Sequence, residues 1–447
     1  MGFSTEVFEA TVVEAVADGA TPCFAVALSG GLDSTVALHA LRELPLTQSL
    51  RAIHVDHGLH PDSGAWREHC ERACLAIEVP FTDALVDARP RRGESPEEAA
   101  RRARYGCLAT ELRPGETLVT GHHADDQLET VLLQLLRGAG PAGLAAMPVL
   151  ARLGAGWLCR PLLRFRRRDL HAWARARRLS WLEDPSNREA GFDRNYLRHK
   201  VLPALHERWP AAALSAVRSA RHCGEATELL AELADGDLSM LSGDGGLDVS
   251  RMRELSSARQ RNLLRRWLTL SGLELPDSRR TASILDNVLG ARRDGRAEVR
   301  WPGGSVRRYR DRLFALDREM LARLDRPGPD RSWSVDQPLD LGEGMGRLWL
   351  VCGDGPGLSR ERLEKGRLHV RCRAGGEKIR LPGRSGTRSV KKLLQEAGVP
   401  PWWRRHIPLI WHGDRLLCVA DLWYSADSWV SGPEGCRVVW EDRPDFS

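Results

Sequence analysis

Lysine is scarce in this chain of 447 residues, because all but five of its 66 lysine and arginine residues are arginine. The first lysine is Lys200. A Walker A loop needs the pattern Gly-x-x-x-x-Gly-Lys-Ser/Thr to hold nucleotide phosphates, so the N-terminal part of the chain lacks one. Kinase or GTPase-type chemistry at a γ-phosphate is therefore disfavoured. The same scarcity disfavours a covalent lysyl-adenylate enzyme with its nucleophile in the N-terminal half.

Paired cysteines and long apolar segments are also missing. The ten cysteines include no Cys-x-x-Cys pair, and Cys70 and Cys74 come closest to one. In a chain of this length, that scatter predicts reduced thiols in a cytosolic protein. The first 20 residues hold four acidic side chains and no basic segment, unlike a signal peptide. No apolar run reaches the roughly 18 residues that cross a bilayer. We expect a cytoplasmic protein with no membrane partner.

The most informative stretch is residues 23–35, where an apolar run of strand length ends in Ser-Gly-Gly and a helix-compatible segment follows. Two glycines permit positive φ and let a ligand approach the backbone. A helix start directs free N–H groups and a positive dipole end at an anion. Asp33 would repel phosphate unless a cation lay between them, so it predicts Mg²⁺ with a polyphosphate. For Gly-Gly alone, an ordinary capped turn is an equal alternative.

Strand and helix patterns alternate up to about residue 150, which predicts an α/β domain with a mostly parallel, Rossmann-like sheet. Residues 50–55 and 117–120 form the other two clear strand candidates. Ligands of such sheets bind at the carboxyl ends of the strands, and polar residues follow all three candidate strands. The nucleotide-binding candidates at these ends are Ser29, Gly30, Gly31, Leu32, Asp33, Ser34, Asp56, His57, Gly121 and His122.

Two predicted helices add candidates for catalysis. Arg101 lies in an alanine-rich segment at residues 97–105, where it could reach a phosphate or simply be solvated. At 100° per residue, His122, Asp126 and Glu129 share one stripe of the next helix. We expect leucines and a valine from residue 128 to 136 to form its buried side. The acidic stripe suits acid–base chemistry, although acidic residues in a first turn also compensate the helix dipole.

The rest of the chain is basic, in keeping with a net charge of +6. Arginines cluster with aromatics around residues 160–198, a pattern that suits RNA, while a solvated helix face is the alternative. Residues 213–320 look mainly helical, with short strands at 301–314. Residues 321–365 look like a linker with some strand. A compact α+β unit follows at 366–447. We therefore expect a catalytic domain at 1–212, a helical domain at 213–320, the linker and a C-terminal domain.

Several motifs together resemble one family, the bacterial tRNA(Ile)-lysidine synthetases of the N-type ATP pyrophosphatase, or PP-loop, superfamily. Ser-Gly-Gly-x-Asp-Ser alone indicates only the superfamily. The narrower resemblance rests on Gly-His-His-Ala-Asp-Asp-Gln at 121–127 and Glu-Asp-Pro-Ser-Asn at 183–187. The stretches 373–377, 391–394 and 400–402 are similar to that family's C-terminal domain. Residues 213–360 match least distinctly.

The resemblance implies a reaction, its partners and residue roles. ATP would adenylate carbon 2 of the wobble cytidine in an isoleucine tRNA with a CAU anticodon. Free L-lysine would then displace AMP and give lysidine, which changes decoding from AUG to AUA. It implies Asp33 as the Mg²⁺ ligand and Asp126, Glu129 and Arg101 as further catalytic residues. The C-terminal domain would select the tRNA, and a homodimer is left open.

Three other functions stay open at this point. A tRNA 2-thiolation enzyme of the same superfamily would also adenylate a cytosine, but the absence of Cys-x-x-Cys counts against it. An amide-forming synthetase for small molecules would not require the long basic C-terminal half. A non-catalytic RNA-binding protein would not require the intact loop at Ser29–Ser34.

Overall fold

The computed structural model describes residues 2–56, 58, 63–91, 94–183, 193–243, 246–292, 297–326, 328, 330–353, 355–364, 367–432 and 434–444. The chain divides into two compact units, which we call unit 1 (Met1–Leu229) and unit 2 (Leu230–Ser447). Within the described ranges, no helix is both long and apolar enough to span a membrane.

Unit 1 is built on a six-stranded sheet in the order β3-β2-β1-β4-β6-β5. All neighbouring strands are parallel except β5 and β6, which form an antiparallel pair. The predicted α/β class and the three predicted strands are confirmed. From β1 the chain adds β2 and β3 on one side of β1 and then crosses to add β4 on its other side. The topological switch point, where ligands of such sheets bind, therefore lies between β1 and β4. The strands are β1 (Cys23–Ala27), β2 (Ser49–Asp56), β3 (Phe81–Leu85), β4 (Thr117–Val119), β5 (Leu150–Leu153) and β6 (Gly156–Cys159).

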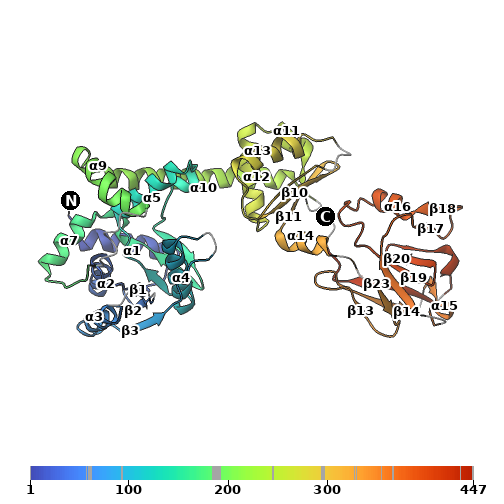
Figure 1. The fold of residues 1–447 in the computed structure, drawn as a ribbon, viewed down its shortest axis with the longest axis horizontal. Helices are drawn as coiled ribbons and strands as arrows, with labels where there is room; N and C mark the ends of the chain where they lie inside the picture. Colours follow the sequence, from blue (N-terminus) through green and yellow to red (C-terminus); the bar gives the residue numbers. More distant parts are fainter. Residues whose placement is uncertain are drawn as a thin grey trace. The chain divides into compact units, whose positions relative to one another are not determined.

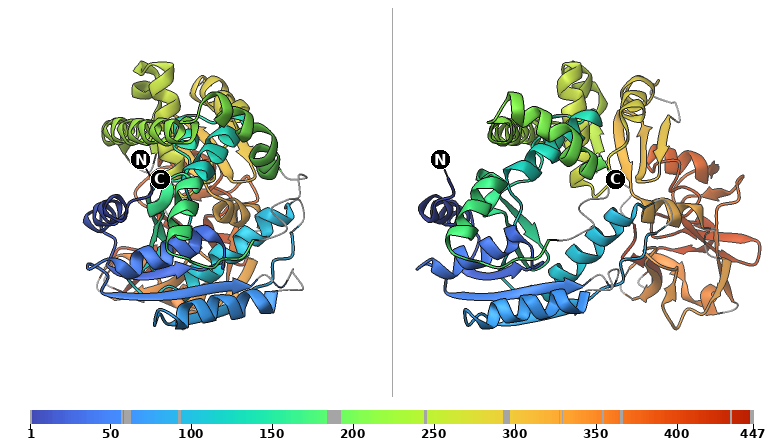
Figure 2. Two further views of the ribbon diagram at one scale, coloured as in Figure 1. Left: turned by 90° about the vertical axis from the view of Figure 1, so that its left-hand side faces the viewer. Right: turned by 60° about the vertical axis from the view of Figure 1, so that its left-hand side comes forward.

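Helices cover both faces of this sheet because side chains alternate along each buried strand. Phe24 and Val26 of β1 pack into one apolar cluster, while Ala25 packs into another with Leu108 and Leu118. The α3 helix runs beside β2, drawn in blue in Figures 1 and 2. The first face is covered by α1 (Thr5–Ala17), α2 (Leu32–Glu43), α3 (Ser63–Leu75) and α7 (Arg167–Ala176), and the second by α4 (Pro96–Glu111).

A helical layer is formed by segments before and after the last two strands of the sheet. Its apolar centre joins Leu128 to Leu202 and Ala213. The long α10 (Ala212–Leu241) begins in unit 1 and ends in unit 2. The other members are α5 (Ala124–Leu136), α6 (Pro141–Leu144), η1 (Pro161–Arg164), α8 (Asp193–Tyr196), η3 (Leu197–Val201) and α9 (Leu202–Arg208).

The first part of unit 2 packs helices on a five-stranded sheet in the order β7-β8-β11-β10-β9. The predicted short strands at 301–314 lie in this sheet. Leu263, Leu264 and Trp301 belong to its core. Its elements are β7 (Ser242–Gly243), β8 (Gly246–Asp248), α11 (Val249–Glu254), α12 (Ser257–Leu270), α13 (Ser278–Ser283), η4 (Ile284–Leu289), β9 (Glu298–Trp301), β10 (Gly304–Tyr309) and β11 (Arg312–Leu316).

The remainder of unit 2 contains two further five-stranded sheets, β12-β16-β19-β20-β21 and β13-β14-β23-β15-β22, and the pair β17-β18. The stretch 321–365, expected to be a linker with some strand, supplies β12 to β15 to these sheets. The elements are α14 (Arg318–Asp325), β12 (Asp330–Trp333), β13 (Leu339–Asp340), β14 (Arg347–Cys352), β15 (Gly357–Ser359), α15 (Arg360–Glu364), β16 (Leu368–Cys372), β17 (Lys378–Arg380), β18 (Thr387–Ser389), α16 (Val390–Glu396), β19 (Pro408–His412), β20 (Arg415–Val419), β21 (Trp423–Tyr424), η5 (Ala426–Ser428), β22 (Trp429–Val430) and β23 (Gly435–Glu441).

Two expectations are corrected by the structure. Leu135 and Leu136 are exposed, whereas Asp126 and Glu129 are buried, so the polar stripe of α5 faces the protein. Arginines from a distant segment neutralise that stripe, which makes its burial tolerable. The cysteines are also not all reduced, because Cys352 and Cys436 form a disulfide between β14 and β23.

Candidate functional site

The Ser-Gly-Gly loop lies between β1 and α2 at the carboxyl edge of the unit 1 sheet. Gly30 has a φ of 81°, which a side chain would disfavour. The hydroxyl of Ser34 accepts a hydrogen bond from the backbone N–H of Ser29 at 3.2 Å and donates to the carbonyl of Gly31 at 3.1 Å. Thr35 donates to the same carbonyl at 2.9 Å. The hydroxyl of Ser29 lies 3.1 Å from that of Ser34 and accepts from the backbone N–H of Gly31 at 3.3 Å, so all three hydroxyls hold the loop in shape.

Gly121, at the end of β4, fixes the position of this loop. A Cβ atom at Gly121 would lie 2.8 Å from the backbone carbon of Asp33 and from the backbone nitrogen of Ser34. Backbone atoms cannot yield as a flexible side chain can, so only glycine fits against the first turn of α2. Gly121 therefore serves the packing of the loop, and its nucleotide-binding role stays a prediction.

Asp33 lies in the first turn of α2 with one carboxylate oxygen unsatisfied. Its Oδ1 atom is buried and has no hydrogen-bond partner among the described residues. Its Oδ2 atom lies 3.7 Å from Nε2 of His123 and 3.9 Å from Nε of Arg167. Burial raises the pKa of Asp33, and the charge of Asp126 adds to this, while His123 and Arg167 oppose it. A buried carboxylate oxygen without a partner is costly in the absence of a cation.

His123 joins Asp33 to Asp126 and caps α5. The backbone N–H of Asp126 donates to Nδ1 of His123 at 3.3 Å, and Asp126 accepts from the backbone N–H of His123 at 3.0 Å. Because Nδ1 is an acceptor, the proton of a neutral ring lies on Nε2. That nitrogen lies 3.4 Å from Asp126 and 3.7 Å from Asp33. His123 was not among the residues predicted for the site, although its place before the acidic turn is a capping signal.

Asp126 is ionised in this setting. Burial works against its charge, but His123, His122, Arg194 and the backbone N–H of His123 hold the pKa of Asp126 at about 2. His122 precedes the helix, and its Nδ1 atom lies 2.8 Å from the hydroxyl of Thr120. Burial lowers the pKa of His122 to about 3, so its ring is neutral near pH 7.

Glu129 is enclosed by two arginines that the sequence analysis did not select. Arg194 donates to Glu129 at 2.7 Å, and Arg198 donates to both of its oxygens at 2.8 and 3.0 Å. Arg198 also reaches Asp126 at 3.1 Å. Since the lone pairs of Glu129 are engaged by guanidinium groups, Glu129 is better suited to position these arginines than to accept a proton. Both arginines lie in the arginine-rich stretch at 160–198, but nothing in that pattern indicated Glu129 as their partner.

Arg101 and Asp56 lie at the periphery of this cluster. Arg101 is exposed on α4, with its guanidinium 4.9 Å from the centre of the Tyr105 ring, and its charge contributes to the low pKa of His122. Asp56 ends β2, where it accepts from the backbone N–H of Gly58 at 2.8 Å. His57 and the motif residues 184–187 lie outside the described residues. The structure therefore gathers Ser29 to Ser34, Gly121, His122, Asp126 and Glu129 most closely.

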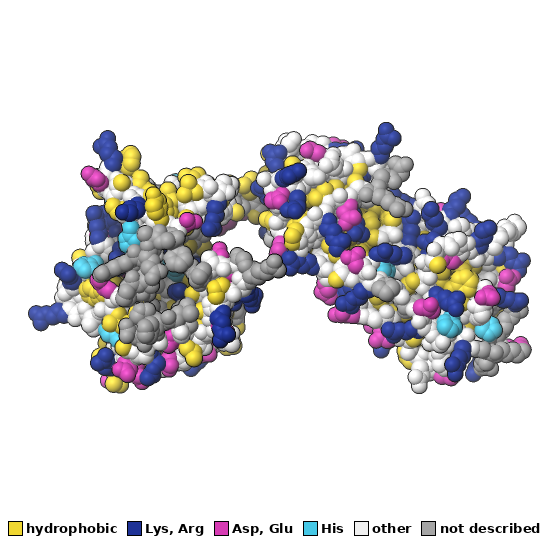
Figure 3. All heavy atoms as spheres, viewed as in Figure 1, with side chains coloured by type: hydrophobic (Ala, Val, Ile, Leu, Met, Phe, Trp, Pro, Cys, Tyr) yellow, Lys and Arg dark blue, Asp and Glu magenta, His cyan; other side chains and the backbone are white. Residues whose placement is uncertain are grey.

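The basic stretch after β6 is largely paired within unit 1. Arg160 is buried and donates to the carbonyl of Pro148 at 2.9 Å, and Arg164 pairs with Glu14 at 2.7 Å. Arg166 pairs with Asp169 at 2.8 Å, which leaves Arg167 as the residue of the predicted run that faces Asp33. Figure 3 shows basic and acidic side chains interspersed over the visible face of each unit.

The arrangement suits an ATP-dependent reaction that needs one bound Mg²⁺ ion. Within the described ranges, no three histidine, cysteine or acidic side chains form a ready-made metal site. Mg²⁺ is ordinarily held by one or two carboxylates together with substrate phosphates and water. The unsatisfied Oδ1 of Asp33, in the first turn of α2, fits that requirement.

Comparisons with known proteins agree with this geometry. The PP-loop domain family matches residues 4–205. The TilS substrate binding domain matches residues 247–314, and the TilS substrate C-terminal domain matches residues 368–440. The fold and the site together define an ATP-using enzyme of the PP-loop class.

Full-length relatives narrow the class further. The tRNA(Ile)-lysidine synthase of Methylococcus capsulatus is 43% identical over 427 residues, which covers 93% of this chain and 95% of the relative. That of Alkalilimnicola ehrlichii is 44% identical over 94% of both chains. That of Coxiella burnetii is 41% identical over 89% of this chain and 88% of the relative. The chain belongs to the tRNA(Ile)-lysidine synthase family.

Proposed function

We propose that this protein ligates lysine to carbon 2 of the wobble cytidine in an isoleucine tRNA with a CAU anticodon. ATP is consumed, AMP and pyrophosphate are released, and the product is lysidine. The observation that carries this proposal is an identity of 43% to a tRNA(Ile)-lysidine synthase along 93% of the chain. The ordered match of a PP-loop domain and two TilS substrate domains supports it.

The loop at Ser29–Ser34 would bind the pyrophosphate portion of ATP. Its backbone N–H groups and the N-terminus of α2 present partial positive charge to an anion. The positive φ of Gly30 and the tight contact of Gly121 preset this backbone before ATP arrives. Pre-organised donors of this kind stabilise charge that develops on a leaving group. The loop thus favours release of pyrophosphate as the cytidine is adenylated.

Asp33 would hold the Mg²⁺ ion, and this ion would neutralise charge on the departing pyrophosphate. His123 orients the free carboxylate from one side, and Arg167 contributes positive charge from another. Arg167 is 60% exposed at its side chain, so it is accessible to a phosphate of the tRNA.

Asp126 would orient the ε-amine of lysine or remove its proton. Its low pKa keeps it anionic near pH 7 and therefore attractive to an ammonium group. A carboxylate with so low a pKa is a weak base, which favours the orienting role over proton removal. Glu129 would act indirectly by holding Arg194 and Arg198, while Arg101 would meet the incoming tRNA.

Incubation of the purified protein with ATP, lysine and bulk bacterial tRNA tests this proposal. We expect lysidine by nucleoside mass spectrometry, with AMP formed in equal amount. A thiolated cytidine would instead identify the 2-thiolation activity. Absence of any modified nucleoside, with ATP left intact, would favour a non-catalytic RNA-binding protein and refute the proposal.

A further inference from the structure

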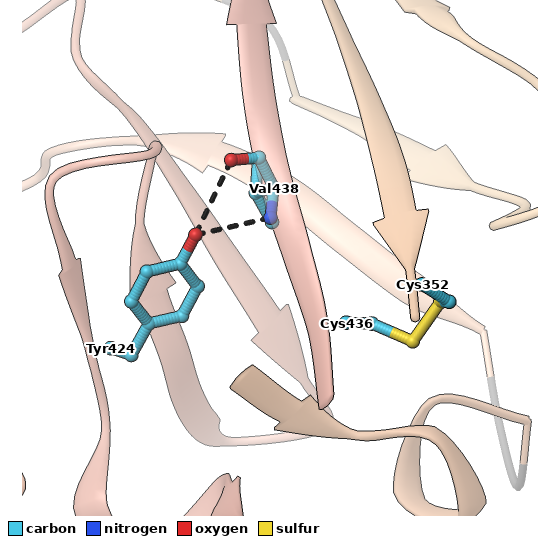
Figure 4. The surroundings of a disulfide bond; sticks show 4 residues. All are labelled: Cys352, Tyr424, Cys436 and Val438. Atoms are coloured by element: carbon cyan, nitrogen blue, oxygen red, sulfur yellow. Dashed lines mark hydrogen bonds between the residues drawn. A yellow bond between two sulfur atoms is a disulfide. The ribbon is translucent and has the colours of Figure 1, made fainter. Parts of the chain in front are cut away.

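The disulfide in unit 2 has no part in the proposed reaction. Cys352 is the last residue of β14 and stands directly opposite Cys436 of β23 in the antiparallel register (Figure 4). The two cysteines are 84 residues apart in sequence, so only the sheet brings them together. Cys352 also lies outside the segments that match the TilS substrate domains.

Other interactions keep the two strands paired without the sulfur bond. The backbone ladder pairs β14 with β23 from Arg347 and Glu441 to the two cysteines. The hydroxyl of Tyr424 in β21 accepts from the backbone N–H of Val438 at 3.1 Å and donates to its carbonyl at 3.3 Å, which also holds β23 to the other sheet (Figure 4). At the far end of the pair, Arg347 bonds to Glu441 at 2.7 Å. Reduction would therefore leave the two thiols facing each other. Groups held in this way have a high effective concentration, which favours closure of the disulfide again.

The two cysteines differ in their exposure to solvent. Cys436 is fully buried, whereas Cys352 is exposed at the rim of the sheet. Disulfides exchange by direct attack of a thiolate on a sulfur atom, so access decides which sulfur reacts. An incoming thiol can approach Cys352 and displace Cys436 as the leaving group.

We propose that Cys352 and Cys436 form a reversible thiol–disulfide site that exchanges with small thiols and disulfides of the glutathione class. A thiolate attacks Cys352, a mixed disulfide forms there, and Cys436 leaves as a thiolate that takes up a proton. A second thiolate then attacks the mixed disulfide and releases Cys352. Two small thiols are oxidised to one small disulfide while the protein gains two thiols. The reverse reaction uses the small disulfide as its oxidant.

Closure of this bond has a defined structural consequence. The loop between the two cysteines contains β15 to β22, including all of β16, β19 and β20. A cross-link over so long a loop stabilises a protein mainly by restricting its unfolded chain. The oxidised protein should therefore melt about 5–10 °C above the reduced protein.

Thiol trapping in redox buffers tests the proposal on the full-length protein. Samples equilibrated at a series of reduced to oxidised glutathione ratios are alkylated and digested, and peptides are quantified by mass spectrometry. We expect the cross-linked 352–436 peptide to fall smoothly as the ratio rises and to return when the ratio is reversed. Both cysteines alkylated at every ratio would overturn the proposal. So would a cross-link that resists reduction until the protein is denatured.

Substitution separates this site from the other cysteines. Cys352→Ser should abolish the cross-link and make the melting temperature independent of the glutathione ratio. Cys223→Ser, a half-buried free cysteine in α10, is the matched control and should leave both properties unchanged. A melting temperature that still responds to the ratio in Cys352→Ser would assign the effect to other thiols. Lysidine formation does not enter these readouts, so they stand whether or not the proposed function is correct.

Discussion

Both units have an apolar core, but unit 1 also gathers buried titratable side chains at one edge of its sheet. At the carboxyl edge of its parallel sheet, unit 1 buries His123, Asp126 and Glu129, which are 3%, 8% and 1% exposed. The antiparallel sheets of unit 2 enclose an extended apolar cluster that includes Trp333, Trp403 and Trp440. Burying charge is costly unless it is paired, whereas apolar burial is favourable. The carboxyl edge of unit 1 therefore depends on paired charges, whereas the core of the C-terminal sheets depends on apolar contacts.

A second contrast lies within unit 1. Arg51 and Glu116 form a buried pair at 2.7 Å, and further bonds to the carbonyl of Glu111 and the N–H of Arg113 satisfy both groups. Asp33 instead retains a buried oxygen without a partner. Satisfied buried charges hold the sheet together, whereas the unsatisfied one marks the place where a ligand is expected.

The largest effect is expected from Asp33→Ala, which should reduce ATP turnover at least about 1,000-fold because the Mg²⁺ ligand is lost. The melting temperature should stay the same or rise, since an unsatisfied buried carboxylate is removed. Affinity for tRNA should stay within a few-fold. ATP-to-AMP turnover, calorimetry and filter binding measure these properties. Asp83→Ala, in β3, is the control, and wild-type pyrophosphate release from Asp33→Ala would exclude the metal role.

Removal of unit 2 should have the next largest effect. A chain that ends at Leu229, the last residue of unit 1, should keep a folded ATP site but lose most tRNA modification. A cut near residue 360 is less informative, because it separates β14 from its partner β23. Equilibrium binding of an ATP analogue and lysidine yield are the measurements. Full modification by the short chain would reassign unit 2 to stability or assembly.

Breaking the buried pair of Arg51 and Glu116 should reduce the stability of the protein without directly affecting catalysis. Glu116→Gln should lower the free energy of unfolding by about 3 kcal/mol, because Arg51 is left as a buried unpaired charge. Burial opposes the charge of Glu116, but Arg51 and the N–H of Arg113 lower its pKa below 4.5. The stabilisation is therefore present above pH 4.5. It is lost as the pH falls through the pKa that Glu116 has in the folded protein, which is lower than 4.5.

Urea unfolding at several pH values measures this effect. Wild-type protein should lose stability more steeply than Glu116→Gln as the pH falls below about 4.5. Parallel curves for the two proteins would show that this pair is not the source of the acid sensitivity.

The smallest effect concerns the arginines beside the site. Arg167→Ala should weaken tRNA binding and lower the slope of log affinity against log salt by about 0.7–0.9, as expected for one phosphate contact. Arg166→Ala should change that slope little, because Arg166 pairs with Asp169. ATP affinity should stay unchanged in both. Equal slopes for the two variants and the wild type would show that Arg167 is an exposed residue that does not contact tRNA.

Local sequence determined the elements that carry the loop. An apolar run followed by Ser-Gly-Gly predicts a strand, a turn and a helix, because each depends on neighbours in the chain. The structure has β1 at Cys23–Ala27 and α2 at Leu32–Glu43, with Gly30 at positive φ between them. The alternation of strands and helices was likewise enough to predict a parallel sheet. This sheet brings the residues that follow β1 and β4 to one edge.

Only the tertiary structure decided how the charges pair. Arg194 and Arg198 meet Glu129 across 65 and 69 residues, and Cys352 meets Cys436 across 84. Helical periodicity grouped Asp126 with Glu129 but could not tell whether their stripe faced water or protein. That choice depends on the free energy of neutralising the carboxylates, and the neutralising arginines come from a separate helix. Local patterns specify which side chains share a face, whereas long-range packing determines what that face meets.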